Sequence, residues 1–234
     1  MNNSIELKPH EKLKKLEETL KVVKNSDDIS GVFNTLLNLA ELCYEIKANE
    51  LGLKYSQEAI ELDKKDPVYK NIHEFYKFLG DFNFELGYLD QALDAYTISI
   101  GKTPKKTSFK ILSEMNFKMG RINYLQDDLK KAIKHFKKAE KICEEAGLYA
   151  EQARIYNQIG LMYINKIPEP EGYGIDKYTT VDIRGTSSFN KAKKYFKKAK
   201  LILEKNNLTE IENTLYNAIQ ANLTSKWKDY KSLF

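Results

Sequence analysis

The sequence predicts an all-α solenoid of repeated helix pairs, because small residues recur in it at a fixed period. One series is spaced forty residues apart and consists of Ala40, Gly80, Gly120 and Gly160. A second series lies twelve residues behind the first and consists of Gly52, Ala92 and Ala132, followed by Ala192 after twenty extra residues. Self-similarity at one period is the sequence signature of repeat architectures. With five prolines and eleven glycines in the whole chain, few turn residues remain for a many-stranded sheet.

Composition places the chain among globular proteins with an uneven charge. The 234 residues are 42% hydrophobic and 12% aromatic, which is enough to bury a core. The net charge is +5, but residues 1–101 carry −6, 102–141 carry +8, 142–187 carry −3 and 188–234 carry +6. Cys43 and Cys143 are expected to be buried thiols rather than a disulfide. No apolar run approaches a membrane span and no signal peptide is recognised, so we expect a cytoplasmic protein without membrane insertion.

The N-terminal elements follow from helical spacing of apolar residues. In residues 9–25, the positions Leu13, Leu16, Leu20 and Val23 form one apolar stripe with a charged back, and Pro9 suits a first helical turn. We expect this helix to cover the open end of the first repeat. The first repeat is predicted over residues 30–66, with helices at about 29–46 and 50–64.

The remaining repeats are separated by turn residues. The second is predicted over 67–104, with Gly87 between its helices, and the third over 107–147, with Asp128 as part of a cap and Gly147 at a helix C-terminus. The fourth, over 148–205, contains a loop inserted at 167–188 with two prolines and three glycines, which is expected to pair as a hairpin or to stay without regular structure. A capping helix is predicted over 208–229, because Gln220 takes the place of the small residue and no further helix need pack there.

The phrases around the small residues resemble the tetratricopeptide repeat. The second repeat has Tyr76-x-x-Leu79-Gly80 and then Ala92-x-x-x-Tyr96, and the fourth has Tyr156-x-x-Ile159-Gly160 and then Ala192-x-x-x-Phe196. The resemblance covers about residues 30–229 and implies a right-handed superhelical solenoid of four such helix pairs. The period of forty, instead of the usual 34, is similar to that of Pins-type scaffolds and of the peptide-pheromone receptors of Gram-positive bacteria. We expect the six additional residues to lengthen the helices by nearly one turn each.

The same resemblance implies that the first helix of each pair lines a concave groove that binds a peptide. The residues placed there are Asn34, Asn38, Glu41, Glu45, Glu74, Lys77, Phe78, Asp81, Phe84, Phe117, Lys118, Arg121, Tyr124, Arg154, Asn157, Gln158, Leu161 and Asn165. Amide side chains in this set can hold an extended peptide backbone. The cations Lys118, Arg121 and Arg154 favour a ligand carboxylate, and the acidic residues favour a basic group. Two alternatives stay open, namely that the aromatic residues are core and that the charges form intramolecular ion pairs.

No constellation for catalysis is found. The three histidines, His10, His73 and His135, are far apart in the sequence, and no metal-binding, phosphate-binding or nucleophile motif is present. We therefore expect no enzyme activity, no metal and no cofactor. The predicted function is a scaffold or adaptor that binds a protein or peptide in the groove.

Three other functions are left open by the sequence. The first is a bacterial peptide-signal receptor or a regulatory module, and the second is a self-assembling homo-oligomer. The third is nucleic-acid binding through the lysine-rich segments 130–138 and 191–200, although these are more simply read as solvated faces of second helices. The inserted loop at 167–188 is expected to lie beside the groove.

Overall fold

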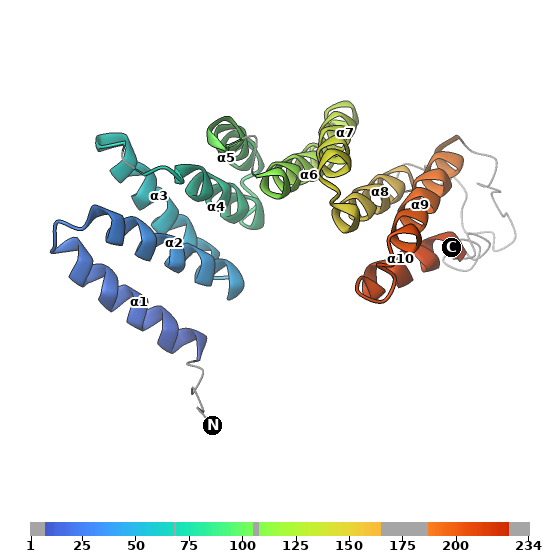
Figure 1. Cartoon of the computed structure of the whole chain (residues 1–234). Coiled ribbons are helices and arrows are strands. Elements are labelled where there is room, and N and C mark those ends of the chain that lie inside the picture. Colours follow the sequence, from blue (N-terminus) through green and yellow to red (C-terminus); the bar gives the residue numbers. More distant parts are fainter. Residues whose placement is uncertain (1–7, 68, 105–107, 165–186, 225–234) are drawn as a thin grey trace, which may run out of the picture. The chain divides into compact units, whose positions relative to one another are not determined.

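The computed structural model of the chain describes residues 8–67, 69–104, 108–164 and 187–224. In these ranges the protein is all-helical, with ten α-helices and no strand, as predicted (Figure 1). The inserted loop up to residue 186, Asn165 and the part of the predicted capping helix beyond residue 224 lie outside the described residues. The chain divides into two compact units, residues 1–108 and 109–234, which are described in turn. That both belong to one domain stays a prediction.

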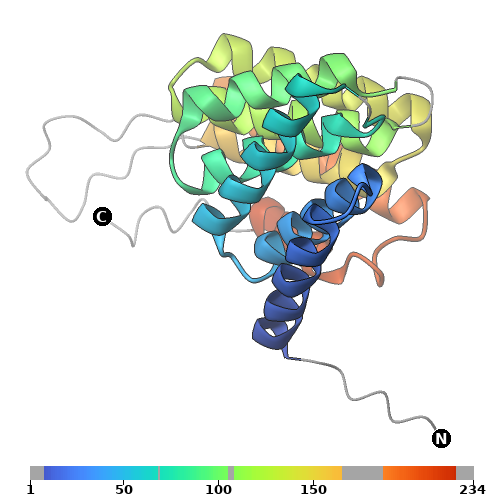
Figure 2. The same cartoon turned by 90° about the vertical axis from the view of Figure 1, so that its left-hand side faces the viewer.

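Unit 1 holds five helices, each packed against the next. They are α1 (Pro9–Lys24), α2 (Ile29–Glu45), α3 (Asn49–Lys65), α4 (Ile72–Glu85) and α5 (Leu89–Lys102). Pro9 begins α1, and the Asp28 carboxylate caps α2 by accepting a hydrogen bond from the Gly31 backbone N–H at 2.9 Å. Figures 1 and 2 agree that α1 lies along α2. The first helices of the two pairs, α2 and α4, also contact one another.

Unit 2 consists of two helix pairs followed by a C-terminal helix. Its helices are α6 (Phe109–Leu125), α7 (Leu129–Ala146), α8 (Tyr149–Ile164), α9 (Ser187–Lys205) and α10 (Asn213–Thr224). Asp128 caps α7 by accepting from the Lys131 N–H at 3.0 Å. The first helices α6 and α8 contact one another, and α10 packs on α9. The α-helix α10 begins at Asn213 rather than at residue 208, because residues 209–212 form turns.

The glycine series is explained by aromatic rings that lie directly on it. A methyl group added at Gly80 would come within 2.6 Å of the Tyr96 ring, and one at Gly120 within 2.6 Å of Phe136. At Gly160 it would come within 2.5 Å of Phe196. Each ring belongs to the second helix of the same pair and is almost fully buried. The glycines are therefore needed for close packing within a pair and not for a turn.

The first helix pair has no aromatic residue at the position that packs on the small residue in the other pairs. Ala40 stands in the glycine position and Ser56, not an aromatic residue, stands sixteen positions later, and both are fully buried. The ring is supplied from the next helix, where Phe82 covers Gly52 so closely that a side chain there would overlap it. The first repeat is thus the weakest match to the repeat sequence, but an aromatic ring, that of Phe82, still packs on a glycine, Gly52.

A third series, in the backbone, sets the turn between the two helices of a pair. Lys47, Gly87 and Asp127 are forty residues apart and have φ angles of 59°, 82° and 60°. Each follows a first helix, and the next residue donates a backbone hydrogen bond five positions back, as Tyr88 N–H does to the Asn83 carbonyl at 2.8 Å. Only the turn at Gly87 is predicted from the sequence, because lysine and aspartate do not by themselves indicate a left-handed backbone conformation as glycine does.

The six additional residues of the period do not all lengthen helices. Between α3 and α4, and again between α5 and α6, six residues form the connection, whereas α7 and α8 are joined by two residues. The helix α7 is correspondingly long, with 18 residues, while α4 and α5 have 14 each. The helices α3 and α6 nevertheless have 17 residues each beside six-residue connections, so the additional residues are divided between helices and connections.

Candidate functional site

The surface of α2 and α4, here named the α2–α4 surface, carries most of the predicted groove residues of unit 1. Four of them are exposed along α2, namely Asn34, Asn38, Glu41 and Glu45. On α4, Glu74, Lys77 and Phe84 are half-buried, whereas Phe78 and Asp81 are buried. The two amides lie one turn apart on α2, and the Tyr69 hydroxyl donates to the Asn34 side-chain oxygen at 3.4 Å.

Two carboxylates of this surface have raised pKa values. Burial, followed by the charges of Glu74 and Glu45, raises the pKa of Glu41. Burial also raises the pKa of Glu74, while the Lys77 ammonium opposes this shift. The surface is therefore one where additional positive charge would be favoured.

A pH-dependent prediction follows for Glu74. Because its folded-state pKa is raised, the native state binds the proton more tightly than the unfolded chain, so the ionised carboxylate lowers stability at neutral pH. Glu74→Gln is expected to raise the free energy of unfolding at pH 7 by up to ~1 kcal/mol, and the gain should vanish below about pH 4. Urea unfolding at both pH values measures this, with the exposed Glu50→Gln as control. A loss of stability at pH 7 would contradict the prediction.

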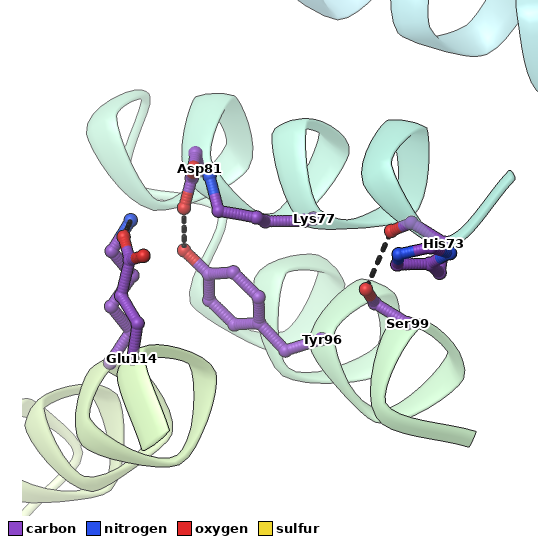
Figure 3. Close-up of polar contacts among 7 residues, drawn as sticks. His73, Lys77, Asp81, Tyr96, Ser99 and Glu114 are labelled. Atoms are coloured by element: carbon purple, nitrogen blue, oxygen red, sulfur yellow. Dashed lines mark hydrogen bonds and ion pairs between the residues drawn. The ribbon is translucent and has the colours of Figure 1, made fainter. Parts of the chain in front are cut away.

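The side chains of Lys77 and Asp81 are bound to neighbouring residues within unit 1. The Asp81 carboxylate accepts a hydrogen bond from the Tyr96 hydroxyl at 2.6 Å, and the Lys77 ammonium lies 3.1 Å from its other oxygen (Figure 3). The same ammonium lies 4.6 Å from the centre of the Phe78 ring and 5.8 Å from that of Tyr44. Asp81 was predicted as a groove residue, and the structure places it in a buried link between α4 and α5.

The helix α1 contributes to a hollow that sequence reasoning missed. The hollow measures about 360 Å³ and is lined by Lys12, Lys15, Leu16, Thr19, Asn38, Glu41, Leu42 and Glu45. Two lysines of α1 thus stand on one wall and two glutamates of α2 on the other. The sequence treats α1 only as a cover for the first repeat, although its polar positions at helical spacing signal that a second face is in use.

The surface of α6 and α8, here named the α6–α8 surface, holds a smaller and more enclosed hollow. Its volume is about 230 Å³, and its lining consists of Lys110, Ser113, Glu114, Phe117, Lys118, Glu151, Arg154 and Ile155. Three of these were predicted as groove residues. Phe117 and Ile155 supply the apolar part, and the Phe117 ring lies 5.7 Å from that of Phe136, so it belongs to the core as well.

The charges around this hollow are already paired within unit 2. The Lys118 ammonium lies 2.9 Å from Glu114, and the Arg154 guanidinium lies 2.7 Å from Glu212, just before α10. Lys110 and Glu151 are 3.9 Å apart across the two helices. Lys118 and Arg154, two of the three cations of the predicted cluster, are thus in ion pairs, which is one of the alternatives left open by the sequence. Reversing the charge of Arg154 would also set two acids together beside α10.

The other predicted residues of unit 2 lie on the same two helices. Arg121 is exposed on α6, and Tyr124 is half-buried and packed against the core of α7 and α8. On α8, the three residues Asn157, Gln158 and Leu161 are half-buried. Asn165 lies outside the described residues.

The reactive side chains are placed as structural groups. Cys43 and Cys143 are buried free thiols, as expected, and burial raises the pKa of each to about 11, which makes them poor nucleophiles at neutral pH. Burial lowers the pKa of His73 and of His135. Among the described residues, no group of acidic, histidine and cysteine side chains could hold a metal ion, and no helix is long and apolar enough to cross a membrane.

Comparison with known proteins relies on structure, since no family model and no curated protein sequence matches the chain. Repeats described as tetratricopeptide-like in a kinesin light chain of Podospora anserina align with a TM-score of 0.60 at 9% identity, covering 85% of this chain and 88% of that one. The fold is that of a tetratricopeptide-repeat solenoid. MamA aligns with a TM-score of 0.58 at 22% identity, covering 83% of this chain and 88% of that one.

A third tetratricopeptide-type neighbour was solved with a bound peptide. It is the Rap conjugation gene regulator of plasmid pLS20, in complex with the Phr* peptide, with a TM-score of 0.56 at 14% identity. The alignment covers 93% of this chain and 59% of that regulator. At these identities the three likenesses establish the fold of this chain.

Proposed function

We propose that this protein is an interaction scaffold that binds a peptide segment of a partner protein on the surfaces of its first helices. The observation that carries the proposal is the hollow on the α6–α8 surface, which combines an apolar base with a charged rim. Binding sites for peptide side chains have this composition, because an apolar anchor supplies most of the affinity and polar groups fix its orientation.

The dimensions suit one large side chain. A hollow of about 230 Å³ accommodates a single aromatic or long aliphatic residue against Phe117 and Ile155. The rim ion pairs would remain in place around it and exclude water. In unit 1, the exposed amides Asn34 and Asn38 can donate to and accept from a peptide backbone, which supports binding of an extended segment there.

A free signalling peptide is the second candidate ligand. The Rap regulator is named for its complex with the Phr* peptide, and its fold aligns with 93% of this chain. That likeness supports peptide binding on the tetratricopeptide fold and leaves the regulatory output of this chain open. A receptor would bind a short peptide alone as tightly as the whole protein that contains it, whereas a scaffold would bind the intact partner more tightly.

The proposal is tested by filling the hollow. Peptides are selected from a random phage-displayed library against the whole chain, and their affinities are measured by calorimetry. Glu114→Trp places an indole over Phe117 and is expected to weaken binding at least ~10-fold. The matched control is Glu144→Trp, on the exposed face of α7. If both variants bind the selected peptides equally well, the site lies elsewhere.

A further inference from the structure

The second helices of the four pairs differ sharply in charge although they pack alike. The helix α9 carries seven lysines and one glutamate, and α7 carries six lysines and three glutamates. In unit 1, α3 carries three lysines and four acidic residues, and α5 one lysine and two aspartates. All four helices bury small residues and at least one aromatic residue in their packing faces, so the fold does not require the lysines.

One face of α9 collects these lysines in a continuous row. A shallow hollow of about 380 Å³ is lined by Asn190, Lys193, Lys194, Lys197, Lys198 and Leu201, here named the α9 lysine face. These positions follow helical spacing, and no acidic residue is among them. Lys198 is held by Glu140 at 3.9 Å and lies over the Tyr156 ring at 4.8 Å. No carboxylate of the described residues pairs with Lys193, Lys194 or Lys197.

We propose that the α9 lysine face binds the surface of an anionic lipid bilayer. Clusters of four to eight lysines on a helix are attracted to acidic headgroups, and their effects add. The face also contains Leu201, whose side chain is 62% exposed. An aliphatic residue within a basic face can enter the headgroup region of a bilayer, where it gains affinity that a phosphate backbone would not provide.

Two further observations favour lipid over nucleic acid. Every cation on α7 and α9 is lysine and none is arginine, the residue suited to bidentate recognition of individual phosphates. Of the aromatic residues of α9, Phe189 and Phe196 are buried, and Tyr195 is half-buried, with the Tyr163 ring stacked on it at 5.9 Å and the Lys198 ammonium 5.7 Å from its ring centre. No exposed ring on this face is therefore available to stack on bases.

The experiment measures sedimentation of the whole chain with vesicles. Vesicles of phosphatidylcholine alone are compared with vesicles containing roughly 30% phosphatidylserine at about 0.1 M salt. Wild type should partition only onto the anionic vesicles. The variant Lys193→Gln, Lys194→Gln, Lys197→Gln is expected to lose about 100-fold, since each lysine contributes about fivefold.

The matched control removes the same charge from a second helix of unit 1. Lys54→Gln, Lys64→Gln, Lys65→Gln on α3 should lower partitioning by less than about threefold. An equal loss in both triple variants would show that only net charge matters and would overturn the proposal. Partitioning onto uncharged vesicles to the same extent would do so as well.

A second comparison separates lipid from nucleic acid. Leu201→Ala should weaken binding to anionic vesicles severalfold and leave binding to single-stranded and duplex DNA oligonucleotides unchanged. Binding of the oligonucleotides without binding to the vesicles would replace the lipid proposal by nucleic-acid recognition. Glu114→Trp should leave vesicle binding intact, so the outcome is independent of the proposed peptide site.

Discussion

Gly120→Leu is expected to unfold unit 2 or to lower its stability by at least ~3 kcal/mol. A side chain at this position would begin 2.6 Å from the Phe136 ring, which is fully buried between α6 and α7 and cannot move aside. Since domains are stable by only ~5–15 kcal/mol, the thermal midpoint should fall by roughly 10 °C or more. Circular dichroism during heating measures this.

The control is a glycine in a helix with open space around it. Gly101, in α5, has no atom within 4 Å of an added methyl group. Gly101→Leu is therefore expected to be neutral or to stabilise by up to ~1 kcal/mol, because leucine is the better helix former. Equal midpoints for Gly120→Leu and wild type would refute the role of the glycine series in packing.

The coupling between glycine and ring can be measured directly. Gly120→Ala and Phe136→Leu should each destabilise unit 2, and the double variant should be more stable than additivity predicts by ~1 kcal/mol or more, because the smaller side chain makes room for the added methyl group. Ala40 with Ser56 shows that a pair of positions in this register can be occupied by two small residues. Strict additivity would mean that the two positions do not share the same space.

Periodicity predicted the fold well because a repeated packing contact must recur at a fixed spacing in the sequence. The all-helical repeat, the cap at Asp128 and the turn at Gly87 are those that the sequence predicts. Periodicity did not predict two kinds of feature, namely backbone conformations and the lengths of helices and connections. The left-handed turns at Lys47 and Asp127 have no composition signal, and the additional residues of each period are divided between helix and connection in a way that spacing alone cannot decide.

The candidate site was predicted less well, because position on a helix does not decide what a side chain contacts. Asn34 and Asn38 are exposed as expected, whereas Phe78 is in the core. Arg154 is exposed but bound to Glu212, 58 residues later in the chain. These two residues lie on either side of the inserted loop in the sequence, so a forty-residue period could not predict their ion pair. The contribution of α1 to a hollow was also missed, since α1 lies outside the repeats.

Asp81→Ala is expected to cost about 3–5 kcal/mol, the second large effect. The Asp81 side chain is 1% exposed and that of Lys77 is 16% exposed, so removal of the carboxylate leaves a poorly hydrated ammonium and a buried Tyr96 hydroxyl without their acceptor. Urea unfolding at pH 7 measures the loss, and Asp94→Ala, at an exposed position of α5, is the control.

The fourth pair indicates how the loss can be reduced. There, Leu161 and Phe196 take the places of Asp81 and Tyr96, and in the third pair Arg121 and Phe136 do, so no acid stands at this position where the ring lacks a hydroxyl. The double variant Asp81→Leu, Tyr96→Phe should therefore lose less than the sum of its single changes, with Lys77 as the remaining cost. If Asp81→Ala is as stable as Asp94→Ala, the Asp81 carboxylate is solvated in the groove, as the sequence alone predicts. That result would contradict a buried link between α4 and α5 through Asp81.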